Sequence, residues 1–555
     1  MTDLLEGYRP AAAWDEMYAA PGEPRSHYRS LHRVLGTLSR DDFEARCVAR
    51  DRAFRDQGIT FSLGGGEERP FPLDLVPRII DAEEWAVVEA GVRQRVLALE
   101  RFLADVYGPG EILADGVVPR RLVASSSHFH RCAAALEPAG GVRIHVAGVD
   151  LVRDGAGAFR VLEDNLRTPS GVSYVIENRR AMTHVFPELF ASHRIRRVAD
   201  YPQRLLEAFR ATAPPGVDDP CVVVLTPGIH NSAYFEHSFL ARQMGVELVE
   251  GRDLVCRDQR VYMRTTGGEQ RVDVVYRRVD DEYLDPLHFL PESVLGCAGI
   301  LNAARAGNVT IANAPGNGVA DDKAVYPYVP AMIEYYLGEV PILPNVETYR
   351  LEDTDVCEWV VEHLGDLVLK PVDGSGGKGI VIGPVATAAE LDVLRGKILA
   401  DPRGWIAQEP VALSTAPTFV DGGMGPRHLD LRPFAVNDGR DVWVAPGGLT
   451  RVALPAESLI VNSSQGGGSK DTWVLAAADH GREVSPASVV AAPAAARAAK
   501  APMIGPLPEQ DAQQQQQQQQ QQSRGPEGSE GPEGKGPERK GPERKGPERK
   551  GGAPC

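Results

Sequence analysis

The spacing of apolar residues changes several times along the chain and predicts a different kind of element in each part. Residues 1–120 read mostly as helices. The strongest case is residues 82–108, where apolar residues recur at helical spacing from Trp85 to Leu103. Gly108 and Pro109 end this predicted helix. Residues 143–176 change to strand character, with VRIHVAGVDLV and FRVLEDN joined by a DGAG turn.

Farther along, apolar runs and helical stretches alternate. Residues 221–300 combine short runs such as CVVVL with helical stretches such as SAYFEHSFLARQMG, which is α/β character. Residues 320–475 mix the two again and contain glycine-rich turns at 374–379 and 466–468. The pattern therefore predicts a mixed α/β (α+β) fold up to about residue 475.

The remainder of the chain lacks the apolar residues that a core needs. From about residue 476 it is rich in alanine, and it continues through ten glutamines at 513–522 and GPERK repeats. With almost no large apolar residue after Leu507, this segment buries too little surface to offset the entropy of ordering. We expect 476–555 to be a disordered low-complexity tail.

Composition excludes several classes of protein. The formal net charge of −16 argues against a nucleic-acid binder, which usually carries a basic patch. No apolar run approaches ~18 residues, so no membrane span is predicted. The acidic N-terminus has no apolar segment of a secretory signal. Seven scattered cysteines without a CxxC pair make a zinc site or disulfide framework improbable, so we expect a cytoplasmic protein.

A glycine-rich segment, LVLKPVDGSGGKGIVIG, is the sharpest local motif. Gly374, Gly376 and Gly379 satisfy G-x-G-x-x-G, although a flexible surface turn explains such a match equally well. A dinucleotide site needs a helix after the glycines, and the sequence continues as Ile-Val-Ile, which reads as a strand. A Walker A loop fails too, because Val372 replaces its first glycine and Gly379 its Ser/Thr.

What remains is a strand–loop–strand flap that covers phosphates with backbone N–H groups. The corresponding kinase lysine follows its loop, whereas Lys370 precedes this one. A lysine at the end of the preceding strand would place its ammonium group beside nucleotide phosphates. Lysine is also rare here: residues 1–475 contain five, at 323, 370, 378, 397 and 470.

A group of hard oxygen ligands lies on the predicted strand pair at 143–165. Glu163 and Asn165 differ by two positions and share one face of a strand, and Asp150 on the adjacent strand can point to the same place. Two carboxylates and an amide oxygen suit Mg²⁺, and Arg167 could reach a γ-phosphate or an acyl phosphate. A polar turn ending an ordinary hairpin is the alternative interpretation.

These motifs together resemble the ATP-grasp superfamily, specifically its circularly permuted branch (type 2). Ordinary members place the ATP lysines and the adenine linker before a D…E-x-N metal signature, whereas here Asp150, Glu163 and Asn165 come first. The segments HVAGVDLVRDGAGAFRVLEDNLRTPSGVSYVIENR and NAPGNGVADDKAVYPYVPAMIEYYLGE carry the likeness, which spans roughly residues 60–475. The resemblance implies a circularly permuted ATP-grasp fold with an α/β pre-ATP-grasp-like domain.

The resemblance also implies roles for individual residues, with ATP and Mg²⁺ as cofactors. Lys323 and Lys370 match the two ATP lysines, Arg432 a basic residue near the transferred phosphate, and Asp150, Glu163 and Asn165 the metal ligands. The flap and the adenine-reading linker would comprise Gly374, Ser375, Gly376, Gly377, Lys378, Gly379, Gln408, Glu409 and Val411. No role is predicted for Asn462 and the loop 463–468.

The domain organisation that we expect has five parts. A mostly helical region (1–120) precedes the permuted metal-binding part (121–215) and an α/β substrate-side domain (216–319). The nucleotide-binding lobes (320–475) and the tail (476–555) follow.

Weaker candidates have structural alternatives. His128 and His130 alternate as strand ligands would, but a third ligand is not evident. Substrate contacts are conceivable in the stretch 226–236 (His230, Asn231, Ser232 and Glu236), although a helix cap explains Asn231 and Ser232 more simply. The cluster of Tyr276, Arg277, Arg278, Asp280 and Asp281 could recognise a carboxylate or form surface ion pairs. Lys397 reads as a solvated helix charge.

The activity that the resemblance implies is ATP-dependent ligation of a carboxylate to an amine, or to a thiol, through an acyl phosphate. The branch is similar in fold to glutathionylspermidine-synthetase-like ligases. The substrates would be small molecules or peptides that supply the carboxylate and the amine. Two alternatives remain: an ATP-grasp kinase acting on a non-carboxylate acceptor, and a nucleotide-binding scaffold without turnover that assembles with an operon-encoded protein partner.

Overall fold

A computed structural model describes residues 4–61, 69–134, 136–374, 379–456, 458–461 and 466–477. Of the predicted features, Ser375, Gly376, Gly377 and Lys378 of the flap, Asn462, and the tail from residue 478 onward lie outside the described residues. No helix among the described residues is long and apolar enough to cross a membrane. The six cysteines within them are free thiols.

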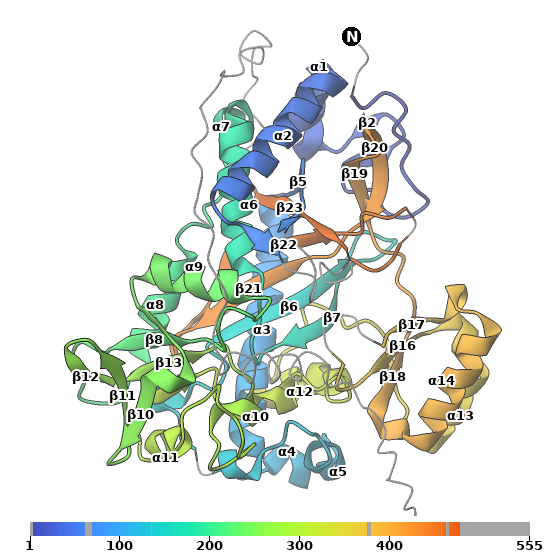
Figure 1. Cartoon of the computed structure of the whole chain (residues 1–555). Coiled ribbons are helices and arrows are strands. Elements are labelled where there is room, and N and C mark those ends of the chain that lie inside the picture. The colour runs from blue at the N-terminus through green and yellow to red at the C-terminus, as the bar shows by residue number, and fades with distance from the viewer. Residues whose placement is uncertain are drawn as a thin grey trace, which may run out of the picture.

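A six-stranded sheet forms the centre of the molecule (Figure 1). Its strands, in spatial order, are β5 (Leu73–Ile80), β23 (Gly468–Val474), β22 (Val442–Val452), β21 (Arg432–Asn437), β6 (Val146–Arg153) and β7 (Phe159–Asn165). The β5–β23 pair is parallel and the other pairs are antiparallel. These strands come from three of the expected parts of the chain, 1–120, 121–215 and 320–475. The three parts are therefore joined by hydrogen bonds within one sheet.

Helices cover both faces of this sheet. The predicted helix at 82–108 is confirmed as α3 (Ala82–Val106), whose N-cap Asp81 accepts a hydrogen bond from the Glu84 N–H. It packs with α12 (Val329–Leu337) on one face, where it meets Val149 and Leu151. The other face carries α6 (Val172–Val185) and α8 (Tyr201–Ala211), with α7 (Pro187–Ser192) following α6.

The N-terminal region is helical only in part. It contains α1 (Arg29–Thr37), α2 (Arg40–Asp56), α4 (Glu111–Ala114) and α5 (Arg120–Ala124). Strand β5 was not expected from the sequence, because Pro77 interrupts its apolar run. Proline is tolerated in this position because β5 is an edge strand of the sheet. Short strands β1 (Tyr18–Ala20), β2 (Glu23–Pro24), β3 (Thr60–Phe61) and β4 (Arg69–Pro70) complete the region.

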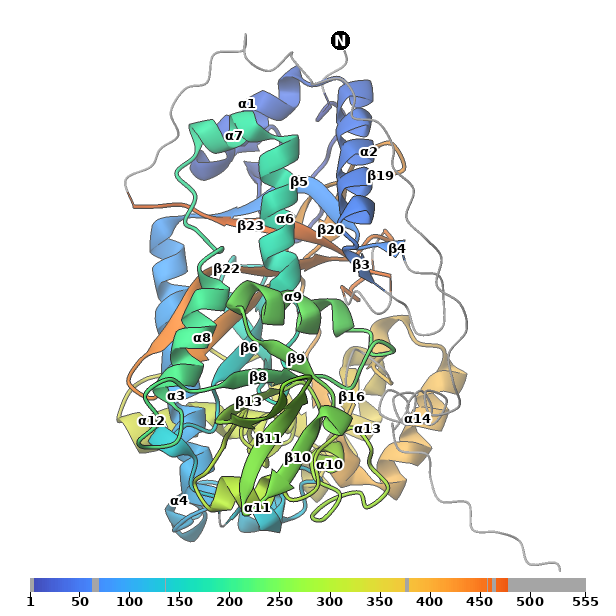
Figure 2. The ribbon, with the colours of Figure 1, turned by 60° about the vertical axis from the view of Figure 1, so that its left-hand side comes forward.

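The α/β unit expected in the middle of the chain lies below α9 (Tyr234–Met244) in Figure 2. Its parallel sheet has the order β14 (Thr310–Ala312), β13 (Val274–Arg277), β8 (Val222–Leu225) and β9 (Glu247–Val249). An antiparallel sheet of β10 (Leu254–Arg257), β11 (Arg260–Thr265) and β12 (Gly268–Val272) accompanies it, with α10 (Asp281–Leu284) and α11 (Ile300–Arg305).

A separate lobe carries Lys370. Its antiparallel sheet has the order β15 (Thr348–Arg350), β18 (Trp405–Gln408), β16 (Val368–Pro371) and β17 (Val381–Ile382), covered by α13 (Thr354–Glu362) and α14 (Ala388–Ala400). Val368 pairs with Ile382 across the glycine-rich loop, so the predicted strand on each side of the loop is confirmed. The hairpin β19 (Thr415–Val420) and β20 (Gly423–His428) packs on β5.

Candidate functional site

A single cavity of about 550 Å³ brings together residues from the central sheet, the α/β unit and the separate lobe. The predicted site residues that line it are Asp150, Glu163, Asn165, Arg167, Lys323, Lys370, Gly374, Gln408, Glu409, Val411 and Arg432. Gly379 is described but does not line it; at its φ of +76°, a Cβ would also lie 3.2 Å from Pro371. Residues that are far apart in sequence therefore share one site.

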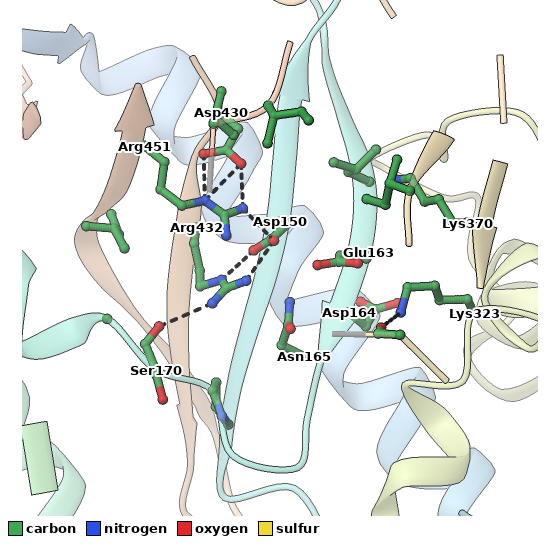
Figure 3. A pocket seen from close by; sticks show the side chains of 18 of the residues that line it. Asp150, Glu163, Asp164, Asn165, Ser170, Lys323, Lys370, Asp430, Arg432 and Arg451 are labelled. Carbon is green, nitrogen blue, oxygen red and sulfur yellow. Dashed lines mark hydrogen bonds and ion pairs between the residues drawn. The ribbon is translucent and has the colours of Figure 1, made fainter. Parts of the chain in front are cut away.

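The strand pair β6–β7 supplies the centre of the cavity. Asp150 pairs with Glu163, but Leu151 pairs with Val161, so Leu162 is an extra residue that forms a β-bulge. Val161 packs in the core beside α3, whereas Leu162 and Glu163 both line the cavity. The carboxylate of Glu163 and the amide of Asn165 lie between the lysines and the arginines of the site in Figure 3.

Asp164 points the other way and anchors β7. Its two carboxylate oxygens accept hydrogen bonds of 2.7 Å each from Nε and Nη2 of Arg95 on α3. Both side chains are 1% exposed. This bidentate pair fixes which face of β7 is turned toward α3. It therefore also orients the side chains of Glu163 and Asn165 toward the cavity.

Asp150 is held by two arginines. Arg432 donates to both of its oxygens, and Nη2 of Arg451 donates to Oδ2 at 2.6 Å. Although burial opposes ionisation, the two guanidinium groups hold the pKa of Asp150 well below its ordinary value. Asp430 accepts hydrogen bonds from Nε and from the same Nη2 of Arg451, and burial raises the pKa of this second carboxyl. Sequence reasoning did not identify Arg451 or the role of Asp430.

The three side chains of the motif Asp321-Asp322-Lys323 make contacts in three different places. Asp321 binds the guanidinium of Arg167 at 3.0 Å, so Arg167 is engaged by the protein itself. Asp322 accepts hydrogen bonds from Ser126 and Arg403. Lys323 reaches into the cavity, where its Nζ donates to the carbonyl of Gly374. The lysine of the motif therefore lies on the cavity wall, and the two preceding aspartates are held by ion pairs and hydrogen bonds within the protein.

Lys370 is buried at the end of β16 on the same wall. The residue is 7% exposed, and burial lowers its pKa to about 8; the charge of Glu163 opposes this shift and that of Lys323 adds to it. Two ammonium groups therefore face the cavity on the side opposite to the arginines (Figure 3). Such a site attracts an anion with several charges.

Beyond the lysines, the cavity becomes apolar. Its wall there consists of Leu162, Val368, Ile380, Ile382, Leu413, Leu459 and Val461. Gln408 lies at its edge and donates to Thr348, while its Oε1 is buried without a hydrogen-bond donor among the described residues. The carboxylate of Glu409 accepts from Tyr349.

The opposite end of the cavity is formed by the turn before α6 and by α9. Ser170, Gly171, Tyr174 and Ser232 line it. Glu236 lies there too, but its Oε2 accepts from the N–H groups of Gly171 and Ser173.

The expectation that Glu236 contacts substrate is not favoured by this geometry, because Arg278 binds its other oxygen at 2.9 Å. The two side chains, each 1% exposed, join the α/β unit to α6. The Asn231 side chain accepts a hydrogen bond from the Ala233 N–H and closes a local turn, but the N-cap of α9 is Ala233, so Asn231 is not the helix cap of the structural alternative.

Of the remaining candidates, Asp280 lines the cavity, whereas the histidines and the other described lysines do not. His130 lies 3.5 Å from Asp281, and no third metal ligand joins it among the described residues. Lys470 is fully buried, where it binds Asp74 and the carbonyl of Pro417. Lys397 is exposed on α14, as expected.

The donor set at the centre fits a hard cation in part. Glu163 forms no ion pair or hydrogen bond with a described side chain, and Nδ2 of Asn165 is buried without an acceptor. Asp150 is already shared by two guanidinium groups. Consistent with this, the described residues contain no cluster of three His, Cys, Asp or Glu side chains arranged to hold a metal ion. One carboxylate and one amide are thus free for Mg²⁺, which commonly completes its shell with phosphate oxygens and water.

Comparison with known proteins gives several matches. A family model described as circularly permuted ATP-grasp type 2 matches residues 77–453. An uncharacterized protein of Mycobacterium tuberculosis is 62% identical over 482 residues, which make up 86% of this chain and 87% of that protein. An uncharacterized Synechocystis protein is 51% identical over 474 residues, covering 85% of this chain and 98% of its own length.

Two further matches have more specific names. A Frankia alni protein named putative glutamate–cysteine ligase is 50% identical over 473 residues, covering 85% of this chain and 54% of that protein. This chain therefore spans about half of that relative. Among solved structures, a glutathione synthetase-like effector from Globodera pallida, in its apo form, superposes with a TM-score of 0.53 over 79% of this chain and 98% of its own. Its sequence identity is 12%, so this match concerns the fold.

Proposed function

Because this chain belongs to the circularly permuted ATP-grasp type 2 family, we propose that it is an ATP-dependent carboxylate–amine ligase. In the first step, an oxygen of the substrate carboxylate attacks the γ-phosphorus of ATP, ADP leaves, and an acyl phosphate forms. In the second step, the amine attacks the acyl carbon, phosphate leaves, and the amine loses a proton. The product is an amide or peptide-like bond.

The nucleotide would lie along the lysine side of the cavity. Lys323 and Lys370 would offset the charge of its phosphates, and the apolar wall beyond them would take adenine, with Gln408 at its edge. Glu163 and Asn165 would hold Mg²⁺. Asp150 would also contact the ion while its carboxylate orients Arg432. The bound ion would neutralise charge on the phosphates that react.

The acceptor would enter at the opposite end, beside Ser170, Tyr174 and Ser232. Catalysis would consist of positioning and charge neutralisation, so no protein nucleophile is required. Arg432 would face the transferred phosphoryl group. In this arrangement the separate lobe that carries Lys370 serves the nucleotide, and the α/β unit at 216–319 serves the acceptor.

One observation carries the proposal. The cavity joins two ammonium groups, an uncommitted Glu163 carboxylate and a guanidinium pair in that order across one space. A polyanionic donor bound at one end would therefore meet an acceptor at the other. The ligase name of the Frankia relative supports the same reaction class.

The direct test is ADP release with Mg²⁺ and ATP against a panel of amino acids, peptides and polyamines, with mass analysis of the products. Glutamate and cysteine belong in the panel because of the name of the Frankia relative. We expect ADP formation that requires both a carboxylate and an amine. A stable phosphorylated product formed without an amine would instead identify a kinase, and nucleotide binding without ADP release would identify a scaffold.

A second expectation concerns pH. Because burial lowers the pKa of Lys370 from 10.5 to about 8, its ammonium group is lost as the pH rises from 7 to 9. The affinity for ATP should fall in this window, approaching about tenfold per pH unit above 8, since the neutral amine does not attract phosphate. Folding stability should move the opposite way between about pH 8 and 10.5, because the unfolded chain then binds more protons.

Titration calorimetry of ATP binding at pH 7, 8 and 9 measures this effect. At pH 8.5, buffers of different ionisation enthalpy should reveal proton uptake on binding. Lys370→Arg should flatten the pH dependence, whereas Lys397→Arg, on the surface of α14, should leave it unchanged. A flat profile in the unmodified protein would mean that Lys370 does not contact the phosphates.

A further inference from the structure

Two buried arginines meet at Asp150, and they are held differently. All three guanidinium nitrogens of Arg432 donate to protein oxygens: Nε and Nη2 to Asp150, and Nη1 to the carbonyl of Ser170 at 3.2 Å. Arg432 is thus tied to the turn before α6 as well as to β6. Its remaining capacity to bind a ligand is limited to the second hydrogen of each terminal nitrogen.

Arg451 has one edge fully engaged and one nitrogen left over. Its Nε donates to both oxygens of Asp430 at 2.9 and 3.0 Å, and its Nη2 is shared between Asp430 and Asp150. Nη1 donates to no described residue, and no dashed line reaches it in Figure 3. Since Arg451 lines the cavity, this nitrogen offers two uncommitted N–H donors on a cation that is otherwise fixed.

The charges around Arg451 favour such a role. Asp150 and Asp430 balance Arg432 and Arg451, so the four side chains together are close to neutral. A cation that is paired along one edge retains its hydrogen-bonding geometry, and it pays little entropy when the free edge binds an oxyanion. The buried carboxylate of Asp430 therefore orients the guanidinium without reaching a ligand itself.

We propose that Arg451 is a catalytic residue whose free Nη1 binds an oxyanion of the reacting group, and that Asp430 is the positioning residue that presents it. This proposal rests on the ligase function proposed above. The reacting group begins as a carboxylate and becomes an acyl phosphate, so the oxyanion belongs either to the carboxylate or to the phosphoryl group in transfer. In both cases the bond is a charge-assisted hydrogen bond that forms as negative charge develops.

The variants are Arg451→Lys, Arg451→Ala and Asp430→Asn in the full chain. The matched control is Asp471→Asn. Asp471 is a buried carboxylate on the neighbouring strand β23 and lies outside the cavity; it binds Arg179 of α6 at 2.8 Å. Each protein is titrated with Mg·ADP alone and with Mg·ADP plus orthovanadate, which imitates a phosphoryl group in transfer. Turnover is measured with the acid and amine identified in the ADP-release panel.

The expected result has three parts. Affinity for Mg·ADP alone stays within about twofold in all variants. The tightening by orthovanadate falls about 10- to 100-fold in Arg451→Lys and Asp430→Asn, the size of a charged hydrogen bond, but not in Asp471→Asn. The kcat falls about 100- to 1,000-fold, and guanidinium ion added to Arg451→Ala restores part of it. A structural defect alone would not be rescued in this way.

The vanadate titration and the turnover measurement together distinguish the carboxylate from the phosphoryl oxyanion. They also distinguish failure of the Arg451 proposal from failure of the ligase proposal. Loss of the vanadate effect identifies the phosphoryl group, whereas a raised KM for the acid with an intact vanadate effect identifies the carboxylate; either result supports Arg451. If the unmodified protein releases no ADP with any acid but the vanadate effect still depends on Arg451, the ligase proposal fails and the oxyanion site stands. Unchanged vanadate tightening together with unchanged kcat and KM would overturn the inference.

Discussion

Replacing Glu163 by Gln is expected to abolish ADP formation, with a loss of at least about 1,000-fold in kcat. Among the oxygen donors at the centre of the cavity, Glu163 alone is a carboxylate without a protein partner in the described structure. An amide at this position keeps the shape but removes the charge that a hard cation requires. Because phosphoryl transfer depends on neutralising the phosphates, the chemical step should suffer most.

The measurement is ADP release under single-turnover conditions, together with Mg²⁺-dependent binding of ATP. In Glu163→Gln we expect the Mg²⁺ dependence of ATP binding to weaken, while metal-free nucleotide binding by the lysine wall persists. Glu89→Gln is the matched control, since Glu89 on α3 forms a surface ion pair with Arg196 and does not line the cavity. ADP release at the normal rate in Glu163→Gln would remove this residue from the metal assignment.

Replacing Asp164 by Ala should destabilise the fold by about 3–5 kcal/mol, the usual effect of removing one partner from a buried ion pair. Arg95 would be left with its charge 1% exposed and without its bidentate acceptor. The strand would also lose the contact that fixes its orientation. Urea unfolding, followed by fluorescence, should show a lower midpoint with a similar slope.

A double variant separates the two consequences of this change. In Arg95→Met with Asp164→Leu, the buried charges are gone, and stability should recover much of the loss because apolar residues of similar volume replace the pair. Activity need not recover, since β7 would no longer be held through a bidentate contact. Equal stability of Asp164→Ala and the unmodified chain would show that the pair contributes little.

The parts of the site that the sequence predicted are those encoded by local patterns. Alternation along a strand placed Glu163 and Asn165 on one side, and the apolar run before the glycine loop placed Lys370 at a strand end. In both cases the required information lies within about 20 residues. The family resemblance then supplied Lys323 and Arg432, which line the same cavity.

The parts that escaped prediction depend on pairing between distant segments. Arg451 lies on a long strand that reads as ordinary core, and only its contact with Asp150, 301 residues away, marks it as part of the site. The role of Glu236 likewise depends on α6, 63 residues earlier. A signal was present for Arg451: it is a charged residue within an apolar strand, at a position that the structure buries.

The bulge at Leu162 makes two neighbouring side chains face the cavity, where regular pleating would allow only one. Leu162 belongs to the apolar wall and Glu163 to the charged centre, so adjacent residues contribute to the parts of the cavity that we propose for the nucleobase and for Mg²⁺. Deleting Leu162 would restore a regular ladder without turning Glu163 away from Asp150. Under the proposed function, this one-residue deletion should weaken discrimination among nucleobases and leave the phosphate-binding side chains in place, so the nucleotide donor and the reaction can change independently.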